Sequence, residues 1–189
     1  WPPRYASRTS PIPGRHGRDA RGTFVVVAAP QVLVALLRGI NVGGSSVIKM
    51  ATVRELAEDC GFTSVRTYVQ SGNVVFRTTT TPARASAALG AALNGATGND
   101  IALAVRTPRE LDALIARCPY DDVSKVHVTF VVDGADPPAP VADPADFAPE
   151  HFTVRGRDTY LFLPHGIGRS KLAQALAKGG AARIGTTRN

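Results

Sequence analysis

The stretch from Arg38 to Lys49 combines glycines, hydroxyls and two cations, which are residue types that bind anions. A glycine-rich loop between a strand and a helix can turn several backbone N–H groups toward one anion. The stretch is not a Walker loop, because no Gly-Lys-Ser/Thr ends it, and it lacks Gly-x-Gly-x-x-Gly. We expect a phosphate or carboxylate site formed by Arg38, Asn41, Gly43, Gly44 and Lys49. The alternative is that the glycines serve only the turn, while Arg38 pairs with a carboxylate of the chain itself.

A second loop, from Pro164 to Lys171, provides the secondary candidates. Ser170 fits the N-cap position of a following helix, while Arg169 and Lys171 place cations where the helix dipole disfavours positive charge. Cations in that position indicate a nearby anion. The alternative is that both side chains simply extend into water.

Common catalytic motifs are absent from the sequence. It has four histidines but no Gly-x-Ser-x-Gly and no His-Glu-x-x-His motif. No motif therefore supports a catalytic triad or a zinc hydrolase site. Aspartates are ligands for hard cations, but in a loop rich in proline and alanine they are usually solvated. These aspartates are Asp121, Asp122, Asp133, Asp136, Asp143 and Asp146. We predict no metal site, and the sequence leaves open the cofactor, the reaction and whether there is one.

The composition is that of an ordinary globular chain. Of its 189 residues, 44% are hydrophobic, which is enough for a real core. The net charge of +7 is concentrated at one end, because residues 1–30 hold five arginines and a single aspartate. Cys60 and Cys118 lie far apart, and neither is in a Cys-x-x-Cys pattern, so we predict buried free thiols and a reducing, cytoplasmic location. The apolar run 23–37 is interrupted by Pro30 and Gln31 and is too short to span a bilayer, so we expect no membrane association.

The first thirty residues differ from the rest. Residues 1–22 carry four prolines, several arginines and no apolar periodicity, so we expect this segment to be disordered and to contribute nothing to folding. We treat 1–30 as a disordered or non-native segment that precedes the first folded unit.

From residue 31 onward the pattern alternates between short strands and helices. The first half predicts a strand at 32–37, a helix at 50–60, a hairpin of 65–69 with 73–77 around Ser71-Gly72, a helix from Pro82 and a strand at 101–105. Strand 32–37 is apolar throughout, as in a central strand covered on both faces, whereas 65–69 alternates and is typical of a sheet edge. Thr107-Pro-Arg-Glu110 is a capping box that begins a linking helix.

The second half repeats this order weakly. It predicts a strand at 126–132, one helical turn near 143–147, a hairpin of 152–155 with 159–163, a helix at 170–177 and a strand at 181–187. The predicted fold class is α+β, with two ferredoxin-like βαββαβ units, also called α-β plaits. The first covers 31–106, and the second covers 107–189 with its linking helix. The completeness of the second unit at its C-terminus is left open.

Several of these motifs resemble one bacterial family, domain of unknown function 1697. The first-half motifs are Arg38-Gly-Ile-Asn-Val-Gly-Gly44, Lys49-Met50, Gly61-Phe62 and Tyr68-Val-Gln-Ser-Gly-Asn-Val-Val-Phe76. Weaker second-half matches are Gly166-Ile-Gly-Arg-Ser-Lys171 and Thr187-Arg-Asn189. The resemblance covers about 32–189 and implies a pair of α-β plaits, but no established activity.

Three functional hypotheses remain open. The first is binding of a small anionic ligand, or an enzyme acting on one, with Arg38 and Lys49 as charge partners. The second is a nucleic-acid-binding module that uses the basic tail and loops, with Tyr68 and Tyr160 as candidates for outward stacking. The third is a homo-oligomer, suggested by the first strand being apolar on both faces. We further expect this strand and strand 73–77 to be adjacent and parallel, which would place the anion loop beside Thr78 to Thr81 and away from the Gln70 to Asn73 turn.

Overall fold

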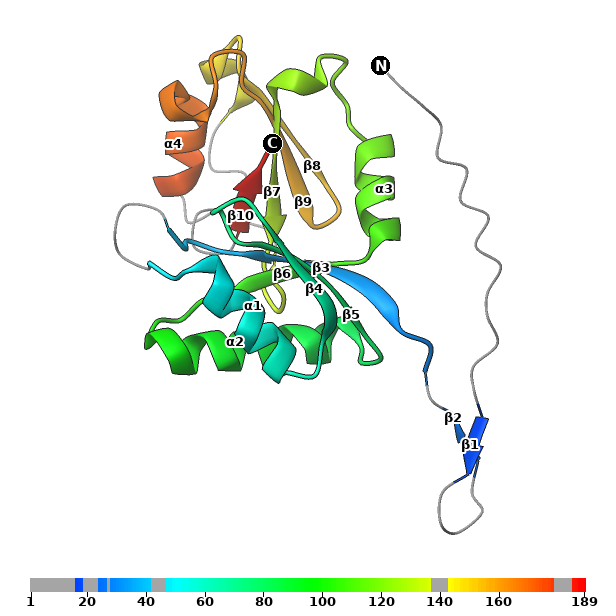
Figure 1. Ribbon diagram of the computed structural model, residues 1–189. Helices are drawn as coiled ribbons and strands as arrows, with labels where there is room; N and C mark the ends of the chain where they lie inside the picture. The colour runs from blue at the N-terminus through cyan, green and yellow to red at the C-terminus, as the bar shows by residue number, and fades with distance from the viewer. Residues whose placement is uncertain (1–15, 19–23, 27, 42–46, 137–142, 179–184) are drawn as a thin grey trace.

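The computed structural model describes residues 16–18, 24–26, 28–41, 47–136, 143–178 and 185–189. Within this part of the chain the fold is mixed α+β, with two four-stranded antiparallel sheets and four α-helices. Figure 1 shows the sheets one above the other, each accompanied by helices. None of the described helices is long and apolar enough to cross a membrane.

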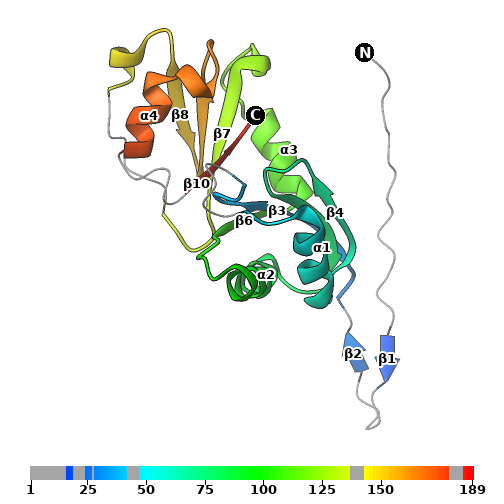
Figure 2. The ribbon, with the colours of Figure 1, turned by 60° about the vertical axis from the view of Figure 1, so that its left-hand side comes forward.

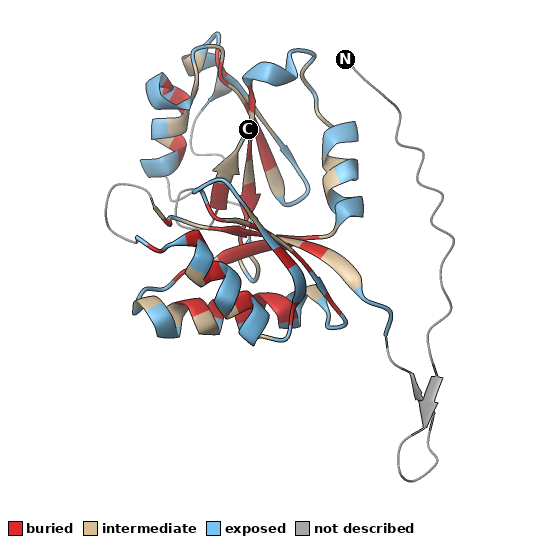
Figure 3. Ribbon diagram, viewed as in Figure 1, coloured by how far each residue is buried: buried red, intermediate tan, exposed pale blue. Residues whose placement is uncertain are grey.

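The first sheet is built from the first half of the chain. Its strands are β3 (Gln31–Leu37), β4 (Thr63–Tyr68), β5 (Asn73–Thr78) and β6 (Leu103–Arg106), in the order β4-β5-β3-β6. As the alternating pattern predicted, β4 lies at an edge. Helices α1 (Met50–Asp59) and α2 (Pro82–Thr97) pack on one face of this sheet, where they share a core with Leu33, Val74 and Phe76. In Figure 3 the buried residues follow β3 and β6 through the middle of the molecule.

Strands β3 and β5 are adjacent but antiparallel, with Val34 directly opposite Val75, so the predicted parallel pairing was wrong. Helix α1 carries the chain back along the sheet, so β4 runs parallel to β3. The tight turn after β4 then reverses the chain, so β5 runs antiparallel to β3. The loop after β3 therefore lies at the same end of the sheet as the turn before β5. Leu37 N donates to Gly72 O at 2.8 Å at this end, which is opposite to the one expected.

Local signals set the helix boundaries. The Thr81 side chain accepts a hydrogen bond from Arg84 N, and Thr107 and Glu110 form the predicted capping box of α3 (Pro108–Ala116). Helix α2 ends at Thr97 and is capped by Gly98, which has a φ of 67°. A glycine in the left-handed region ends a helix without the strain that a side chain would add.

The second sheet repeats the strand order of the first. Its strands are β7 (Val126–Val131), β8 (His151–Arg155), β9 (Asp158–Phe162) and β10 (Gly185–Arg188), in the order β10-β7-β9-β8. Three short 3₁₀ turns accompany it: η1 (Val123–Lys125), η2 (Pro144–Phe147) and η3 (Ile167–Arg169). The single turn η2 stands where the first half has α1, as the sequence predicted. The predicted start of the last strand, residues 181–184, lies outside the described residues.

Two layers cover the second sheet. Helix α4 (Lys171–Lys178) packs on one side through Leu172 and Leu176, and α3 lies on the other side, as Figure 2 shows. The α3 side forms a core shared between both halves, in which Leu36 and Ala104 of the first sheet join residues of the second. The second face of β3 is thus covered within the chain, which removes the observation that suggested a homo-oligomer.

Two short strands lie in the segment for which we expected no ordered structure. β1 (His16–Arg18) and β2 (Phe24–Val26) pair antiparallel with each other. Figure 1 shows this pair apart from the two sheets. A two-stranded hairpin on its own is marginally stable at best. The remainder of residues 1–23 lies outside the described residues.

Candidate functional site

Asn41, one of the predicted anion-binding residues, closes the loop that follows β3. Its Oδ1 accepts from Ile48 N at 2.9 Å, and its Nδ2 donates to Ile48 O at 3.0 Å and to Gln70 O at 2.9 Å. Both amide hydrogens are therefore used within the protein. Asn41 has a φ of 54°, in the left-handed region that asparagine tolerates better than most residues. Asn41, at the start of the loop, thus joins the end of the loop at Ile48 to the β4–β5 turn at Gln70. We call this set of hydrogen bonds the Asn41 latch.

The other predicted residues of this site flank the Asn41 latch. Arg38 is half-buried at the end of β3, where its backbone N donates to Ala102 O at 2.9 Å. Lys49 is exposed and occupies the N-cap position of α1 without a side-chain cap. Gly43 and Gly44 lie outside the described residues. Arg38, Asn41 and Lys49 thus gather at one end of the first sheet, next to Gln70 rather than Thr78.

Arg188, which sequence reasoning did not select, joins the last strand to this end of the first sheet. Its Nε donates to Asn73 Oδ1 at 2.8 Å, and its Nη2 donates to Ser71 O at 2.7 Å and Leu37 O at 3.0 Å. Nη1 donates to Thr186 Oγ1 and to Thr187 O. All five N–H donors of the guanidinium are therefore satisfied by neutral oxygens. Burial lowers the pKa of Arg188.

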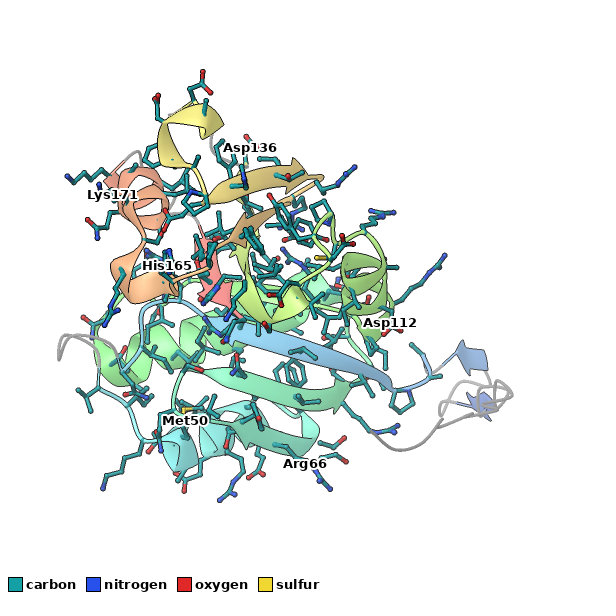
Figure 4. All side chains as sticks on the ribbon, turned by 90° about the horizontal axis from the view of Figure 1, so that it is seen from above. Met50, Arg66, Asp112, Asp136, His165 and Lys171 are labelled. Carbon is teal, nitrogen blue, oxygen red and sulfur yellow. The ribbon has the colours of Figure 1, made fainter. Side chains whose placement is uncertain are left out.

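The secondary candidates lie at the start of α4, where a carboxylate of the chain itself bonds to the first turn of the helix. Glu150 is buried, and its Oε2 accepts from Ser170 Oγ at 3.0 Å and from Leu172 N at 2.9 Å. Ser170 is the predicted N-cap, since its Oγ accepts from Ala173 N at 2.8 Å. Arg169 and Lys171 are exposed. Figure 4 shows Lys171 well apart from Met50, so the two predicted sites are separate.

The two tyrosines proposed for outward stacking have different environments. Tyr160 is only 2% exposed, and its hydroxyl donates to Leu114 O at 2.7 Å, so its assignment as a stacking residue was wrong. Burial, with a further contribution from the nearby Asp158 charge, raises the pKa of Tyr160. Tyr68 is 71% exposed, at the end of edge strand β4.

A hollow lined by several arginines lies between α3 and the β8–β9 turn. We call it the arginine cleft; its volume is about 420 Å³. One wall is the face of α3 that carries Arg109, Glu110, Ala113, Leu114 and Arg117, and the other is the turn from Arg155 to Asp158. Arg106 and Tyr160 complete the lining, which holds five arginines and two carboxylates.

Two of these arginines are paired. Arg106 is buried, its Nη2 lies 3.0 Å from Asp158 Oδ1, and its Nη1 lies 3.5 Å from Asp133 Oδ1. Its guanidinium also sits 5.8 Å from the centre of the Phe130 ring, within range of a cation–π interaction. Arg157 Nη2 lies 3.3 Å from the same Asp133 oxygen.

The other three cleft arginines keep their charge uncompensated. Arg109, Arg117 and Arg155 are exposed, and none of them is in an ion pair within the part of the chain that the structure describes. The nearby Glu110 carboxylate accepts from Thr107 N at 2.7 Å and from Thr107 Oγ1 at 2.8 Å. Partial burial acts to raise the pKa of Glu110, but the bonds from Thr107 and the charges of Arg106 and Arg157 outweigh it, and the pKa is lowered. The cleft therefore has a surplus of positive charge.

A mostly apolar hollow of about 480 Å³ lies on the other side of α3. Its walls include Leu111, Ile115 and Val128, with Arg188 and Asn189 at the rim. The donors of Arg188 are all engaged by protein oxygens, so this cation offers no free N–H to orient a ligand. We therefore assign no ligand to this hollow.

Three of the six aspartates considered as cation ligands bond to other groups of the chain. Asp133 joins the arginine pairs, and Asp122 and Asp143 cap 3₁₀ turns through hydrogen bonds to Ser124 N and Ala145 N. No group of three or more His, Cys, Asp or Glu side chains able to hold a metal occurs among the described residues. Cys60 and Cys118 are free and half-buried, so they are less buried than predicted. Burial, and secondarily the charge of Asp59, raise the pKa of the Cys60 thiol.

Comparison with solved structures places the fold among conserved bacterial proteins. A conserved protein, SP0830, from Streptococcus pneumoniae matches with a TM-score of 0.68 and 20% sequence identity, over 85% of this chain and 93% of that chain. At this identity the likeness concerns the fold alone. No curated protein matches the sequence. The chain belongs to the family described as Protein of unknown function (DUF1697), whose pattern matches residues 31–160.

The arginine cleft was missed because its two walls lie far apart in sequence. Arg109, Ala113 and Arg117 recur at the spacing of one helix face, and this was a readable signal. The opposing wall comes from a turn about forty residues later, and no pattern in the sequence indicates that it faces α3.

Proposed function

We propose that this protein binds a small phosphate- or carboxylate-bearing ligand, and that the arginine cleft holds it. The observation that carries the proposal is the surplus of positive charge in a hollow of ligand size. Small-molecule sites typically have volumes of about 300–1,000 Å³. The cleft has about 420 Å³ and is lined by three exposed arginines without ion pairs among the described residues.

The chemistry of arginine supports this ligand class. A guanidinium presents its N–H donors in a rigid planar fork that matches the oxygens of phosphate and carboxylate. Arg109 and Arg117 approach from the helix wall and Arg155 from the turn, so an anion between the walls can receive donors from both sides. The ion pair between Arg106 and Asp158 fixes two further lining residues of the cleft.

The loop after β3, where we first expected the anion, has weaker support. Asn41 uses both amide hydrogens inside the protein, and Gly43 and Gly44 lie outside the described residues. Arg38 and Lys49 remain the rival site.

Binding of pyrophosphate, adenosine monophosphate and citrate, measured by thermal shift and calorimetry, tests the proposal. A ligand that binds the folded state raises stability by RT ln(1 + [L]/Kd). We expect at least one of these anions to raise the melting temperature, and R109Q/R155Q to abolish the effect. The matched control is R54Q/R84Q, which removes two exposed helical arginines outside the cleft and lowers the net charge equally.

The same titration separates the two sites. Loss of the effect in Arg38→Gln with Lys49→Gln, together with its survival in R109Q/R155Q, would place the ligand at the loop and overturn the assignment. Equal losses in the cleft variant and in R54Q/R84Q would mean that only net charge matters. The absence of any shift with all three anions would reject small-anion binding.

Nucleic-acid binding through the basic tail and loops is the alternative function. It has lost one of its two candidate stacking residues, since Tyr160 is buried. Phosphate-backbone contacts weaken steeply with salt. Oligonucleotide binding that falls sharply between about 50 and 200 mM salt, and that deletion of residues 1–22 abolishes, would favour this alternative.

We also propose that each sheet with its helices is a ferredoxin-like α-β plait, with units at 31–106 and 107–189. The support is the repeated antiparallel order, β4-β5-β3-β6 in the first half and β8-β9-β7-β10 in the second. The weaker match is the second unit, where a 3₁₀ turn replaces the first helix. Weak internal repeats of this kind are expected when two copies of one unit diverge.

A further inference from the structure

The α4 side of the second sheet carries a row of three hydroxyls. Thr187, Thr129 and Thr159 lie directly opposite one another on the adjacent strands β10, β7 and β9. The Oγ1 atoms of Thr129 and Thr187 are hydrogen-bonded at 2.9 Å. On this face of the sheet the threonines stand beside Leu161, which belongs to the apolar core under α4.

The corresponding row of the first sheet is entirely apolar. There, Val105, Ala35 and Val74 lie opposite one another on β6, β3 and β5, and all three are buried in the core under α1 and α2. Valine has nearly the shape of threonine without its hydroxyl. Burying a hydroxyl costs free energy unless it is hydrogen-bonded. This cost applies to Thr159, which is buried, whereas Thr129 and Thr187 are half-buried and bond to each other.

The threonine row is the floor of a hollow. Where α1 covers the first sheet, the described part of the second half has only the turn η2, and a hollow of about 310 Å³ opens between the row and α4. Its other described lining residues are Leu161, Ile167, Ala173, Gln174, Leu176, Ala177 and Gly185. We call this hollow the threonine pocket.

The lining determines which chemistry fits. The described part of the lining includes no charged residue, so an ion in contact with these residues would lose its hydration without gaining a partner. Each threonine hydroxyl can donate one hydrogen bond and accept two, and the Gln174 amide does both. Leu161 and Leu176 add apolar surface. This combination suits a ring that carries hydroxyls around its edge and C–H groups on its faces, which is the chemistry of a neutral sugar.

His127 adds a polar group to the same face of the sheet. It lies two residues before Thr129 on β7, so its side chain points to the α4 side. Its Nδ1 is buried without a hydrogen-bond partner among the described residues. His127 is not among the described lining residues of the threonine pocket, so the proposal does not depend on it.

We propose that the threonine pocket binds a neutral, sugar-sized ligand through the hydroxyls of Thr129, Thr159 and Thr187 and the amide of Gln174. The pocket is separate from the arginine cleft, because it lies on the α4 side of the second sheet while the cleft lies on the α3 side. The protein thus has two sites of opposite preference, one for an anion and one for a neutral polyol.

Chemical-shift perturbation in ¹⁵N-labelled protein, titrated with glucose, ribose and uridine, tests the proposal. We expect at least one probe to shift the amides of β7, β9 and β10 saturably. The nearly isosteric T129V/T159V should abolish these shifts while the rest of the spectrum stays folded. Thr63→Val is the matched control, since Thr63 is exposed on the first sheet and should leave binding unchanged.

Three results would overturn the proposal. The first is that none of the three probes causes a saturable shift up to its solubility limit. The second is binding that survives in T129V/T159V, and the third is a set of shifted amides confined to other parts of the chain. If T129V/T159V fails to fold, Gln174→Leu takes its place, because Gln174 is the fourth residue of α4, is exposed and lines the pocket. Binding that is unaffected by Gln174→Leu would then count against the proposal.

Discussion

Arg188 donates from Nε to the Oδ1 of Asn73 at 2.8 Å, across 115 residues of sequence. The same guanidinium holds Ser71 O and Leu37 O, so the last strand is fastened to the turn and the central strand of the first sheet. The two halves of the chain are therefore joined by a polar clamp as well as by the apolar core beneath α3.

Replacing Arg188 should weaken the whole protein. Arg188→Ala leaves carbonyl oxygens and the Asn73 amide without their donor, and hydrogen bonds to charged groups contribute about 1.5–3 kcal/mol each. We expect a loss of at least about 2 kcal/mol in the free energy of unfolding, measured by urea denaturation. Arg188→Lys should recover only part of it, because three ammonium donors cannot reach five acceptors. Arg66→Ala, at an exposed site, is the control, and an equal loss in this variant would contradict the clamp.

Gly72 and Gly156 should respond differently to the same substitution. Both have positive φ, 81° and 62° respectively, but a Cβ on Gly72 would lie 2.7 Å from Ile40 Cδ1, whereas a Cβ on Gly156 would meet no atom within 4 Å. Gly156→Ala should therefore cost about 1–2 kcal/mol through backbone strain alone. Gly72→Ala should cost clearly more, since core atoms must also move. Equal midpoints in thermal or urea unfolding would show that the crowding at Gly72 is relieved without cost.

Glu150 and Ser170 should show strong energetic coupling. Glu150→Ala leaves the buried Ser170 hydroxyl and the Leu172 N–H without their acceptor, which costs about 1–3 kcal/mol for each unsatisfied group. A double-mutant cycle with Ser170→Ala measures the coupling, and we expect about 1 kcal/mol or more. Hydrogen exchange at Leu172 should accelerate in Glu150→Ala. Additive losses would mean that the carboxylate and the hydroxyl act independently.

Glu110 should make stability fall in mild acid. Its pKa is lower in the folded protein than the ordinary value of 4.5, so the unfolded chain takes up this proton first as the pH falls. The contribution of the group is complete above about pH 4.5 and is lost as the pH falls through the folded-state pKa. Glu110→Gln preserves a capping box but cannot titrate. The stability difference between the native protein and this variant should shrink from about pH 6 to about pH 3, and a constant difference would contradict the assignment.

Local patterns predicted most of the elements because they depend on neighbours in sequence. The capping box at Thr107 and the edge position of β4 follow from such patterns, and the structure has both. The pairing direction of β3 and β5 does not follow from neighbouring residues. It depends on how many times the chain reverses between the two strands. Because β5 runs antiparallel to β3, the anion loop lies beside the turn before β5 and not beside Thr78 to Thr81 as predicted.

The candidate sites were less predictable for a related reason. Residue type alone does not distinguish a ligand-binding side chain from a structural one, so Asn41 was selected for a ligand although its amide latches the loop. Conversely, the acceptors of Arg188 come from three separate stretches of chain, at Leu37, at 71–73 and at 186–187, so its role could not be read from its neighbours in sequence. The roles of Asn41 and Arg188 both depend on which residues lie near them in the folded protein, and this cannot be read from a single sequence.

The core beneath α3 has a consequence for how the polypeptide can be divided. Leu36 and Ala104 come from the first half, whereas Val128 and Phe130 come from the second, and each pair buries its surface against the other. Fragments obtained by cutting the chain after Tyr120 would each present half of an unfinished interior. Neither should be a stable free-standing piece, but the two should recombine when produced together, which makes the chain a natural candidate for split-protein complementation.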